Sequence, residues 1–422
     1  MRRSLERPGT PAGTRVMKRL DELATCSSEP SALTRLYLTP EHSRAIVLVR
    51  GWMEDAGMST EVDDAGTLVG HYRGQQPDAP VLILGSHIDT VRNAGRYDGN
   101  LGVIVAIEAV AALHAAGAVL DFAIEIAAFG DEEGVRFPVT LTGSRSLAGT
   151  FEPANLDAVD KAGFSLRQAL RDFGCNPDGV AHLGRDRSKT LAYVEVHIEQ
   201  GPVLEAEDLP VGVVTAINGA SRFKVDVEGK AGHAGTVPMG LRQDAGAAAA
   251  EMILAIESVA AASDDLVATV GNCEFKPGAV NVIPGSAHFT IDIRSPDDSH
   301  RLAAVTELTT RFEAIAARRN VKVALAKTYD EPAARCNPKL IREFAAALGG
   351  MGLPERLLSS GAGHDGLAMV SLCPIAMLFV RCQGGISHNP AEAVRADDVA
   401  VAIDVLIGFL NRLPSSLSQL AA

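Results

Sequence analysis

The sequence contains few cysteines, and they lie far apart. None of the six forms a Cys-x-x-Cys pair with another; they are Cys26, Cys175, Cys273, Cys336, Cys373 and Cys382. This spacing excludes a zinc finger and a dense disulfide scaffold. We therefore predict reduced thiols that are mostly buried.

Long apolar runs are also missing from the sequence. The longest run, residues 101–112, is interrupted by Glu108, whereas a membrane-spanning helix needs about 18 apolar residues in succession. The sequence starts with MRRSLERPGTPAG, in which the arginines are not followed by the apolar stretch of a secretory signal. We expect a cytoplasmic enzyme with no membrane partner.

Basic residues are scarcer than acidic ones. Lys and Arg total 39 against 52 Asp and Glu, which leaves a formal charge of −13. This balance argues against a nucleic-acid partner and against a surface that holds anionic lipid, because both require basic residues. The apolar fraction of 47% and the charged fraction of 22% are those of a globular protein. At 422 residues the chain is near the limit of one core, so we expect two domains.

Several apolar segments end in polar residues. Residues 81–84 run into Gly-Ser-His, residues 122–129 run into Gly-Asp-Glu-Glu, and residues 192–198 also end in polar groups. Because an Ala- and Val-rich helix, residues 102–116, separates the first two strands, the pattern predicts an α/β fold with a mostly parallel sheet flanked by helices. Ligands of such sheets bind beyond the carboxyl ends of the strands, so we expect these polar clusters to share one site.

A different pattern occupies the middle of the chain. Polar and apolar residues alternate in 221–228, as in a half-exposed strand. The following segments predict a helix, two strands, a helix and a strand at residues 242–262, 266–275, 286–294, 300–319 and 321–327. This β-α-β-β-α-β order is that of a ferredoxin-like domain. Because helix and strand patterns of the first kind resume at residue 339, we expect a catalytic domain of residues 1–214 plus 331–422 and an inserted domain of residues 215–330.

The polar clusters contain the side chains that two divalent cations need. They bring together three histidines and an acidic set, namely His87, His197 and His388 with Asp98, Glu132 and Glu133. Imidazole with carboxylate suits Zn, Mn, Co or Ni rather than the all-oxygen sites of Mg or Ca. One carboxylate can bridge two metals, and a neighbouring carboxylate that binds no metal can take a proton from water. Asp89, close to His87, could hold that imidazole in one tautomer.

Five motifs in these clusters carry a resemblance to a known family. They are DEEGVRF (131–137), HIEQGPVLE (197–205), GKAGHAGTVPM (229–239), GAGHD (361–365) and GISHNPAE (385–392). From about residue 40 to about residue 410 the chain resembles the hydantoinase/carbamoylase branch of the aminoacylase and carboxypeptidase-type dinuclear metallohydrolases. This branch includes N-carbamoyl-L-amino-acid hydrolases, β-ureidopropionase and allantoate amidohydrolase.

The resemblance implies a role for each metal-site residue. His87 and His197 would bind one metal ion, and Glu133 and His388 would bind the other. Asp98 would bridge the two ions. Glu132 would be the general base that activates the water.

The resemblance also implies that the inserted domain is a lid and a dimerisation domain. His233 would reach across a homodimer into the partner's active site and stabilise the oxyanion. Asn281 and Arg294 would hold the α-carboxylate of the substrate. Gln200 would contact the ureido group, and Gly363 and His364 would belong to a turn that lines the substrate.

The expected activity is metal-dependent hydrolysis of the carbamoyl C–N bond of a linear ureido acid. An N-carbamoyl-L-amino acid or N-carbamoyl-β-alanine would yield an amino acid, CO2 and ammonia. One alternative is an allantoate amidohydrolase, which would use the same residues. A peptidase or N-acyl aminoacylase is disfavoured by HIEQG and GAGHD. A binding protein without activity is disfavoured because it would not need Glu132.

Overall fold

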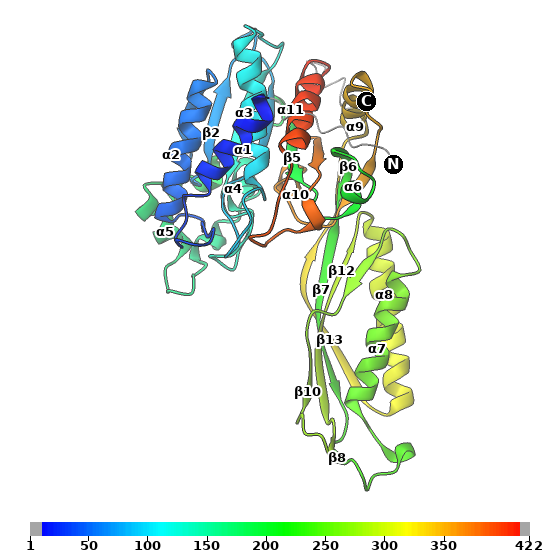
Figure 1. The fold of residues 1–422 in the computed structure, drawn as a ribbon. Helices are drawn as coiled ribbons and strands as arrows, with labels where there is room; N and C mark the ends of the chain where they lie inside the picture. The colour runs from blue at the N-terminus through cyan, green and yellow to red at the C-terminus, as the bar shows by residue number, and fades with distance from the viewer. Residues whose placement is uncertain (1–10, 414–422) are drawn as a thin grey trace. The chain divides into compact units, whose positions relative to one another are not determined.

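The computed structural model describes residues 11–413, which form two compact units (Figure 1). The first unit contains the described residues up to Thr215, Arg335–Leu358 and those from Ala362 onward. The second unit contains Ala216–Ala334 and Ser359–Gly361. The second unit is therefore inserted into the chain of the first.

None of the described helices is both long and apolar enough to cross a membrane. Four of the six cysteine thiols are buried, at Cys26, Cys336, Cys373 and Cys382. Cys273 is exposed and Cys175 is half-buried. Most of the segment MRRSLERPGTPAG lies outside the described residues, and its last three residues begin the first helix.

The larger sheet has nine strands in the order β1-β2-β4-β3-β5-β16-β6-β14, with β15 also paired to β6. The bounds are β1 (Ser59–Val62), β2 (Leu68–Tyr72), β3 (Val81–His87), β4 (Ala123–Phe129), β5 (Thr190–Ile198), β6 (Val211–Ile217), β14 (Ala334–Arg335), β15 (Leu357–Ser360) and β16 (Ile375–Val380). The four strands β4, β3, β5 and β16 run parallel to their neighbours in this group. The expected parallel sheet is confirmed for this centre.

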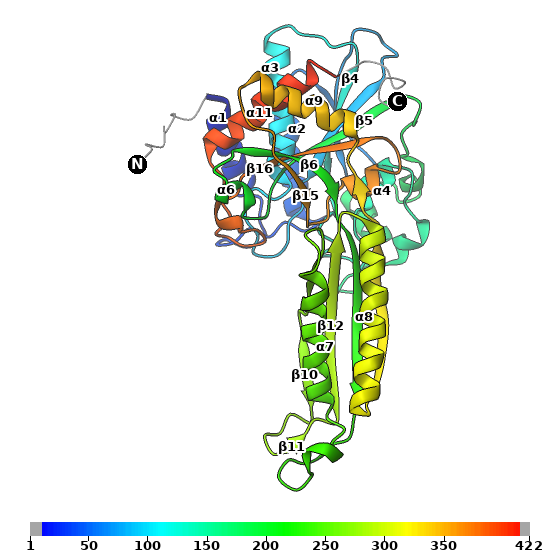
Figure 2. The same ribbon diagram turned by 90° about the vertical axis from the view of Figure 1, so that its right-hand side faces the viewer.

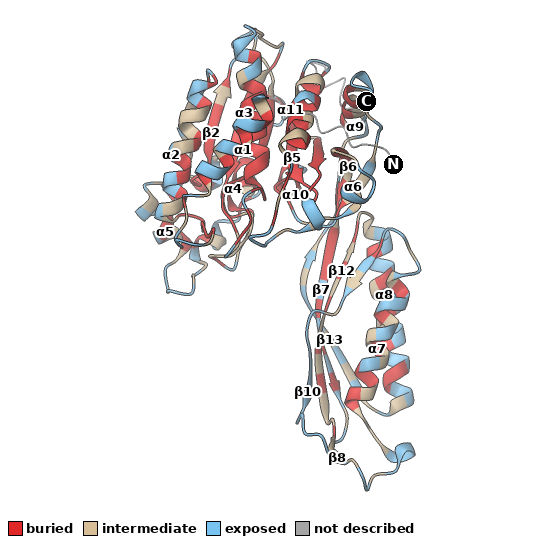
Figure 3. Ribbon diagram, viewed as in Figure 1, coloured by how far each residue is buried: buried red, intermediate tan, exposed pale blue. Residues whose placement is uncertain are grey.

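The outer strands of this sheet differ from the expectation. Strand β2 pairs antiparallel with β4, β1 pairs antiparallel with β2, and β6 pairs antiparallel with β16. The sheet is therefore mixed. In the centre, almost every residue of β3, β4, β5 and β16 is buried (Figure 3). Strands covered on both faces read as continuous apolar runs, which is why the sequence showed these strands clearly.

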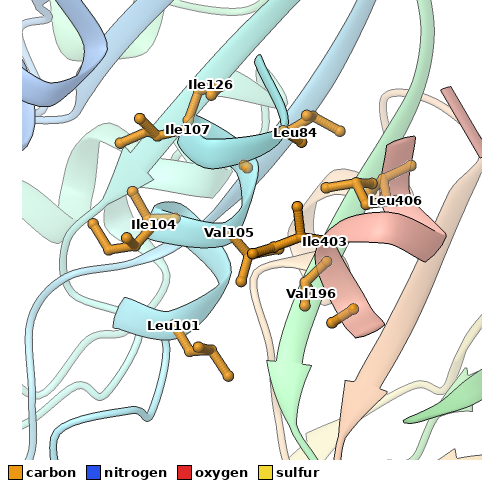
Figure 4. Packing of buried hydrophobic residues seen from close by; sticks show 14 of the residues in the cluster. Leu84, Leu101, Ile104, Val105, Ile107, Ile126, Val196, Ile403 and Leu406 are labelled. Carbon is orange, nitrogen blue, oxygen red and sulfur yellow. The ribbon is translucent and has the colours of Figure 1, made fainter. Parts of the chain in front are cut away.

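Helix α3 (Asn100–Ala115) packs over the centre of the sheet. Its Leu101, Ile104, Val105 and Ile107 lie among residues of β3, β4, β5 and α11 (Ala396–Leu410), as Figure 4 shows. A Cβ atom at Gly102 would lie 2.0 Å from the carbonyl oxygen of Val196, so the helix backbone approaches β5 as closely as glycine allows. This contact places the loop before α3 beside the carboxyl end of β5.

The other helices of the first unit, and the short 3-10 helices of both units, are as follows. The α-helices of the first unit, besides α3 and α11, are α1 (Pro11–Leu23), α2 (Pro40–Asp55), α4 (Thr142–Leu147), α5 (Leu166–Phe173), α6 (Val203–Ala206), α9 (Pro338–Gly350) and α10 (Gly366–Met369). Short 3-10 helices are η1 (Pro153–Asp157), η2 (Val180–His182), η3 (Met239–Leu241) and η4 (Gln383–Gly385). Helix α1 buries its Val16 and Leu20 in the core.

The second unit has the expected β-α-β-β-α-β order. Its strands and helices are β7 (Gly219–Glu228), α7 (Ala245–Ala260), β9 (Val267–Thr269), β10 (Cys273–Lys276), β12 (Ser286–Ser295), α8 (Asp298–Arg319) and β13 (Lys322–Glu331). The sheet order is β10-β12-β7-β13, with antiparallel pairs throughout and β9 paired to β12. Helices α7 and α8 lie side by side over this sheet (Figure 2). The ferredoxin-like topology is confirmed.

The strand expected at residues 266–275 is broken in two. Val270, Gly271 and Asn272 separate β9 from β10, and the backbone of Asn272 exchanges hydrogen bonds with Thr290 of β12. A small antiparallel sheet of β8 (Gly232–His233) and β11 (Val282–Ile283) was not expected either. Two-residue strands of this kind leave no periodic signal in a sequence.

Candidate metal centre

The candidate ligands lie beyond the carboxyl ends of the parallel strands. His87 is the last residue of β3, and His197 is the penultimate residue of β5. Glu132 and Glu133 follow the end of β4, and His388 follows β16. Asp98 precedes α3. The structure brings all the clusters expected at this edge of the sheet to one place.

Two groups of three possible ligands share Asp98. His87, Asp98 and His197 each offer one atom within 4.8 Å of the other two, and Asp98, Glu133 and His388 do the same. The Oδ1 atom of Asp98 lies 3.1 Å from Nε2 of His197 and 3.7 Å from Nε2 of His87. Its Oδ2 atom lies 3.1 Å from Nε2 of His388. Each oxygen of Asp98 therefore faces one group, as in a carboxylate that bridges two cations.

Both buried histidines present the same ring nitrogen to Asp98. The Nδ1 atom of His87 lies 3.1 Å from the carbonyl oxygen of Asp89, and Nδ1 of His197 lies 2.9 Å from that of Ile198. A proton on Nδ1 bonded to these carbonyls leaves Nε2 as the free ligand atom. Gly99, with φ of 67°, passes so close to His87 that a Cβ there would lie 2.4 Å from the ring. Glycine is needed at this position to admit the imidazole.

The carboxylates of the centre are paired with imidazoles rather than with a Lys or Arg among the described residues. Burial raises the pKa of Glu132 well above its usual value and that of Glu133 to about 7. Burial would also raise the pKa of Asp98, but the three histidines hold it well below its usual value. Among the described residues, no Lys or Arg forms a salt bridge with Asp98, Glu132 or Glu133. Three imidazoles and two carboxylates in such a site fit divalent cations such as Zn, Mn, Co or Ni.

Glu132 lies beside the two groups and belongs to neither. Its Oε2 atom lies 3.8 Å from Nε2 of His87, and its side chain is 12% exposed. A Cβ atom at Gly363 would lie 3.8 Å from Oε1 of Glu132, so the expected substrate-lining turn passes next to this carboxylate. Such a carboxylate can exchange a proton with water at the site.

Asp89 connects the end of β3 to the acidic pair. Its carboxylate oxygens accept hydrogen bonds from the backbone N–H groups of Glu132 (3.3 Å) and Glu133 (3.4 Å). The Oδ1 atom of Asp89 lies 3.6 Å from Nδ1 of His87, whereas the carbonyl oxygen of Asp89 lies only 3.1 Å from the same nitrogen. In the structure, Asp89 therefore holds the Glu132–Glu133 turn more directly than it holds the imidazole.

His364 and Gln200 make contacts that were not expected from the sequence. His364 is 1% exposed, and its ring lies edge-on to that of His197 at 4.3 Å between centroids. Burial lowers the pKa of His364 well below its usual value, so the ring is neutral. Nε2 of Gln200 donates to Oδ2 of Asp98 (3.0 Å) and to Oγ of Ser387 (2.9 Å). The amide of Gln200 thus binds the shared carboxylate, and its contact with a substrate stays a prediction.

Three further residues of this centre were missed in the sequence. Glu195 forms a third group with His197 and His364 behind the first. Ser387 and Glu392 bind the loop of Asp98. All three lie within a few residues of a named histidine, Ser387 and Glu392 inside the motif GISHNPAE, but serine and glutamate at such positions carry no signal of their own.

The residues of the second unit that were expected to act in catalysis or substrate binding lie on its surface or at its sheet. His233 and Asn281 are exposed, and Ala234 donates its N–H to the carbonyl of Asn281 (2.9 Å) next to the β8–β11 pair. Arg294 donates from Nε and Nη2 to Asp292 and from Nη1 to the carbonyl of Gly361. Arg294 borders a cavity of about 630 Å³ together with Asp292 and Gly361. Its guanidinium is thus held in a fixed direction.

Comparisons with known proteins place the chain among metal-dependent hydrolases. The model of peptidase family M20/M25/M40 matches residues 83–412. An allantoate deiminase of Arabidopsis thaliana is 42% identical, over 93% of this chain and 81% of that protein. An N-carbamoyl-L-amino acid amidohydrolase of Geobacillus stearothermophilus is 41% identical, over 93% of this chain and 97% of that protein. A hydantoinase/carbamoylase family amidase from Burkholderia multivorans has a similar structure, with a TM-score of 0.89, 30% identity, and coverage of 97% of this chain and 98% of that one.

Proposed function

We propose, from the premise that the chain belongs to peptidase family M20/M25/M40, that it hydrolyses the carbamoyl C–N bond of a linear ureido acid. The substrate is an N-carbamoyl-L-amino acid or N-carbamoyl-β-alanine, and the products are the amino acid, CO2 and ammonia. Relatives named as N-carbamoyl-L-amino acid amidohydrolases support this substrate class. The position of Asp98 between the two ligand groups is the structural observation that carries the proposal.

Two divalent cations per subunit are part of this proposal. His87 and His197 would hold one, Glu133 and His388 the other, and Asp98 both; Zn is one candidate, and Mn, Co and Ni are the others. When bound, such cations polarise the carbonyl group and lower the pKa of water toward neutrality. The donor set and the raised pKa values of Glu132 and Glu133 support this reading.

Glu132 performs the proton transfers in the proposed reaction. It takes a proton from the water that attacks the carbamoyl carbon and then gives that proton to the leaving amino nitrogen, so that the C–N bond breaks. The released carbamic acid decomposes to CO2 and ammonia. The side chain of Glu132 is only 12% exposed, so few solvent molecules compete with the attacking water for its carboxylate. Its place beside Gly363 supports this role.

The second unit contributes substrate binding in this proposal. Arg294 and Asn281 hold the substrate carboxylate, since a guanidinium fork can bind both carboxylate oxygens. Gln200, Gly363 and His364 contact the rest of the substrate. We further propose that the inserted domain, residues 215–330, acts as a lid whose closure brings these groups to the metal centre.

We also propose a cytoplasmic homodimer. The partner subunit's His233 would stabilise the oxyanion formed on the carbamoyl carbonyl. The exposed apolar side chains near His233 support an interface there, because Met239, Leu241 and Val280 are 77%, 75% and 104% exposed. The six unpaired cysteines suit a reducing compartment.

The proposal is tested by ammonia release from metal-stripped protein reloaded with Zn, Mn, Co or Ni. The panel contains several N-carbamoyl-L-amino acids, N-carbamoyl-β-alanine, allantoate and an N-acetyl amino acid, the last scored for free amine. We expect turnover of an N-carbamoyl amino acid that chelators abolish. Cleavage of the N-acetyl compound alone would instead indicate an aminoacylase and overturn the proposed substrate class.

Allantoate is the second candidate substrate. It is favoured by the 42% identity to the Arabidopsis thaliana allantoate deiminase and by two soybean relatives with the same activity in their names. Allantoate is also a linear ureido acid, so the same residues would act on it. A higher kcat/KM for allantoate than for every N-carbamoyl amino acid in the panel would make it the substrate.

A further inference from the structure

Glu392 is a buried carboxylate bound to the loop that carries Asp98. Its Oε1 atom accepts the backbone N–H groups of Tyr97 (2.8 Å) and Asp98 (3.1 Å). Glu392 is 5% exposed, and none of the salt bridges found among residues 11–413 includes it. A buried carboxylate needs such donors, because burial without hydrogen bonds is strongly unfavourable.

The loop fits closely around this carboxylate. A Cβ atom at Gly95 would lie 2.3 Å from both Cδ and Oε1 of Glu392, which is too close for any side chain at position 95. The glycine therefore lets the backbone of residues 95–98 wrap around the carboxyl group. The two N–H donors and the close contact at Gly95 together fix the position of the Asp98 backbone.

The second oxygen of Glu392 faces the loop that carries His388. Oγ of Ser387 lies 2.9 Å from Oε2 of Glu392 and 3.2 Å from Oδ2 of Asp98. The next residue, His388, has a left-handed backbone with φ of 54°. Through its two oxygens, Glu392 thus joins the loops of Asp98 and His388, which belong to the same ligand group.

We propose that Glu392 is a positioning residue that sets the cation affinity of the Asp98, Glu133 and His388 group. His87 and His197 are anchored in β3 and β5, whereas Asp98 and His388 lie on loops and depend on this connection. The inference rests on the proposed two-metal centre and adds a residue that controls one half of it. Partners behind metal ligands typically change metal affinity about 10- to 100-fold when removed.

The test is calorimetric titration of metal-free full-length protein with Mn²⁺ and, separately, with Zn²⁺. We expect two ions per wild-type subunit. In Glu392→Ala we expect the affinity for the ion of the Asp98, Glu133 and His388 group to fall about 10- to 100-fold. The affinity for the ion that shares only Asp98 with that group should fall less, because His87 and His197 stay anchored in β3 and β5. Glu392→Gln should restore both affinities, because its amide oxygen still accepts the two N–H groups and its NH2 can donate to Ser387.

Asp63→Ala is the matched control. Asp63 also accepts two backbone N–H groups, from Ala65 and Thr67 at 2.9 Å each, and none of its hydrogen bonds reaches a candidate ligand. We expect this variant to bind both ions as the wild type does. Equal weakening of both ions in Glu392→Ala, or wild-type affinity for both, would overturn the positioning role.

Two further measurements keep the outcomes distinct. If Glu392→Ala does not fold, Ser387→Ala removes only the hydroxyl link and should weaken the same ion selectively; unchanged binding there would overturn the inference. In a His388→Ala background, Glu392→Ala should add little further loss for the ion of that group, because both changes act on the same ligand loop. A wild-type protein that binds a single ion would overturn the two-metal proposal itself.

Discussion

In the first unit, His87, His197 and Asp98 are buried at the ends of the central strands, whereas in the second unit His233 and Asn281 face outward. His87 and His197 are each 1% exposed and Asp98 is 5% exposed. His233 and Asn281, by contrast, are exposed and lie beside strands of only two residues. The first unit thus assembles its polar cluster from its own residues. His233 and Asn281 of the second unit are not surrounded by such a cluster. Any role in catalysis or binding therefore depends on a partner subunit or a substrate that contacts them.

The topology of the two sheets explains this contrast. Parallel strands bring their carboxyl ends to one edge, so β3, β4 and β5 deliver His87, Glu133 and His197 to the same place. In the antiparallel sheet of the second unit, neighbouring strands run in opposite directions, so their carboxyl ends do not lie at one edge. Chemistry at the metal centre and binding by the second unit should therefore respond differently to mutation.

The largest effect is expected from Glu132→Gln. We expect kcat to fall roughly 10²- to 10⁴-fold, because the proton acceptor is lost. The metal content should stay at the wild-type level, since Glu132 belongs to neither ligand group. Glu133→Gln is the neighbouring control and should lose bound metal, measured by plasma emission spectrometry. Wild-type turnover in Glu132→Gln would remove Glu132 as the base.

The next largest effect is expected in the second unit, from His233→Ala. Loss of an oxyanion donor should lower kcat about 10²- to 10³-fold without changing metal content. His300→Ala changes an exposed histidine of the same unit and should have no effect.

Coexpression of His233→Ala with Glu132→Gln sharpens this test. If His233 acts across a dimer, mixed dimers contain one intact site, and activity should return to about a quarter of the wild-type value. Mixed dimers as inactive as either parent would show that His233 acts within its own subunit.

A smaller effect is expected from Arg294→Ala. We expect KM to rise about 10- to 100-fold with a lesser change in kcat, because a charge-assisted hydrogen-bond pair to the substrate carboxylate is lost. The KM of Arg294→Lys should lie between those of the wild type and Arg294→Ala, since lysine keeps the charge but lacks the guanidinium fork. Measured on the carboxamide analogue of the substrate, the variants and wild type should have the same KM. An unchanged KM for the acid would contradict the carboxylate role.

The smallest effects are expected in the pH dependence of stability, where the units should differ in sign. Burial raises the pKa of Asp63 from 3.8 to about 6. The folded form then binds its proton more tightly, so this group destabilises the fold progressively as pH rises from about 4 to 6. The free energy of unfolding of Asp63→Asn, relative to that of the wild type, should therefore increase by about 1–2 kcal/mol as the pH rises from 4 to 7, measured by urea unfolding.

Asp330 of the second unit provides the opposite case. Hydrogen bonds from Lys327 and Arg301 hold the pKa of Asp330 well below its usual value. Its contribution is present above its unfolded pKa and is lost as pH falls, so Asp330→Asn should destabilise the protein at pH 7 more than at pH 3. Equal losses at both pH values would contradict this assignment.

The central elements of the fold were predictable because burial leaves a regular pattern. Strands β3, β4 and β5 are continuous apolar runs, and β7 and β12 alternate with period two. The edge strand β1 was missed, since a short strand at an edge is stabilised by its partner rather than by its own pattern. The break at Gly271 was missed because its cause, the bonding to Thr290, is a contact across the sheet.

By itself, the sequence determined which side chains could bind metal and where in the sheet they would meet. Residue type and strand ends suffice for that, because imidazoles and carboxylates after apolar strands converge in a parallel sheet. Only the tertiary structure decided that the two oxygens of Asp98 face different groups, and that Gln200 and Glu392 bind this same carboxylate and its loop. These contacts join segments about 100 to 300 residues apart, and spacing along a chain does not encode distances of a few ångströms across it.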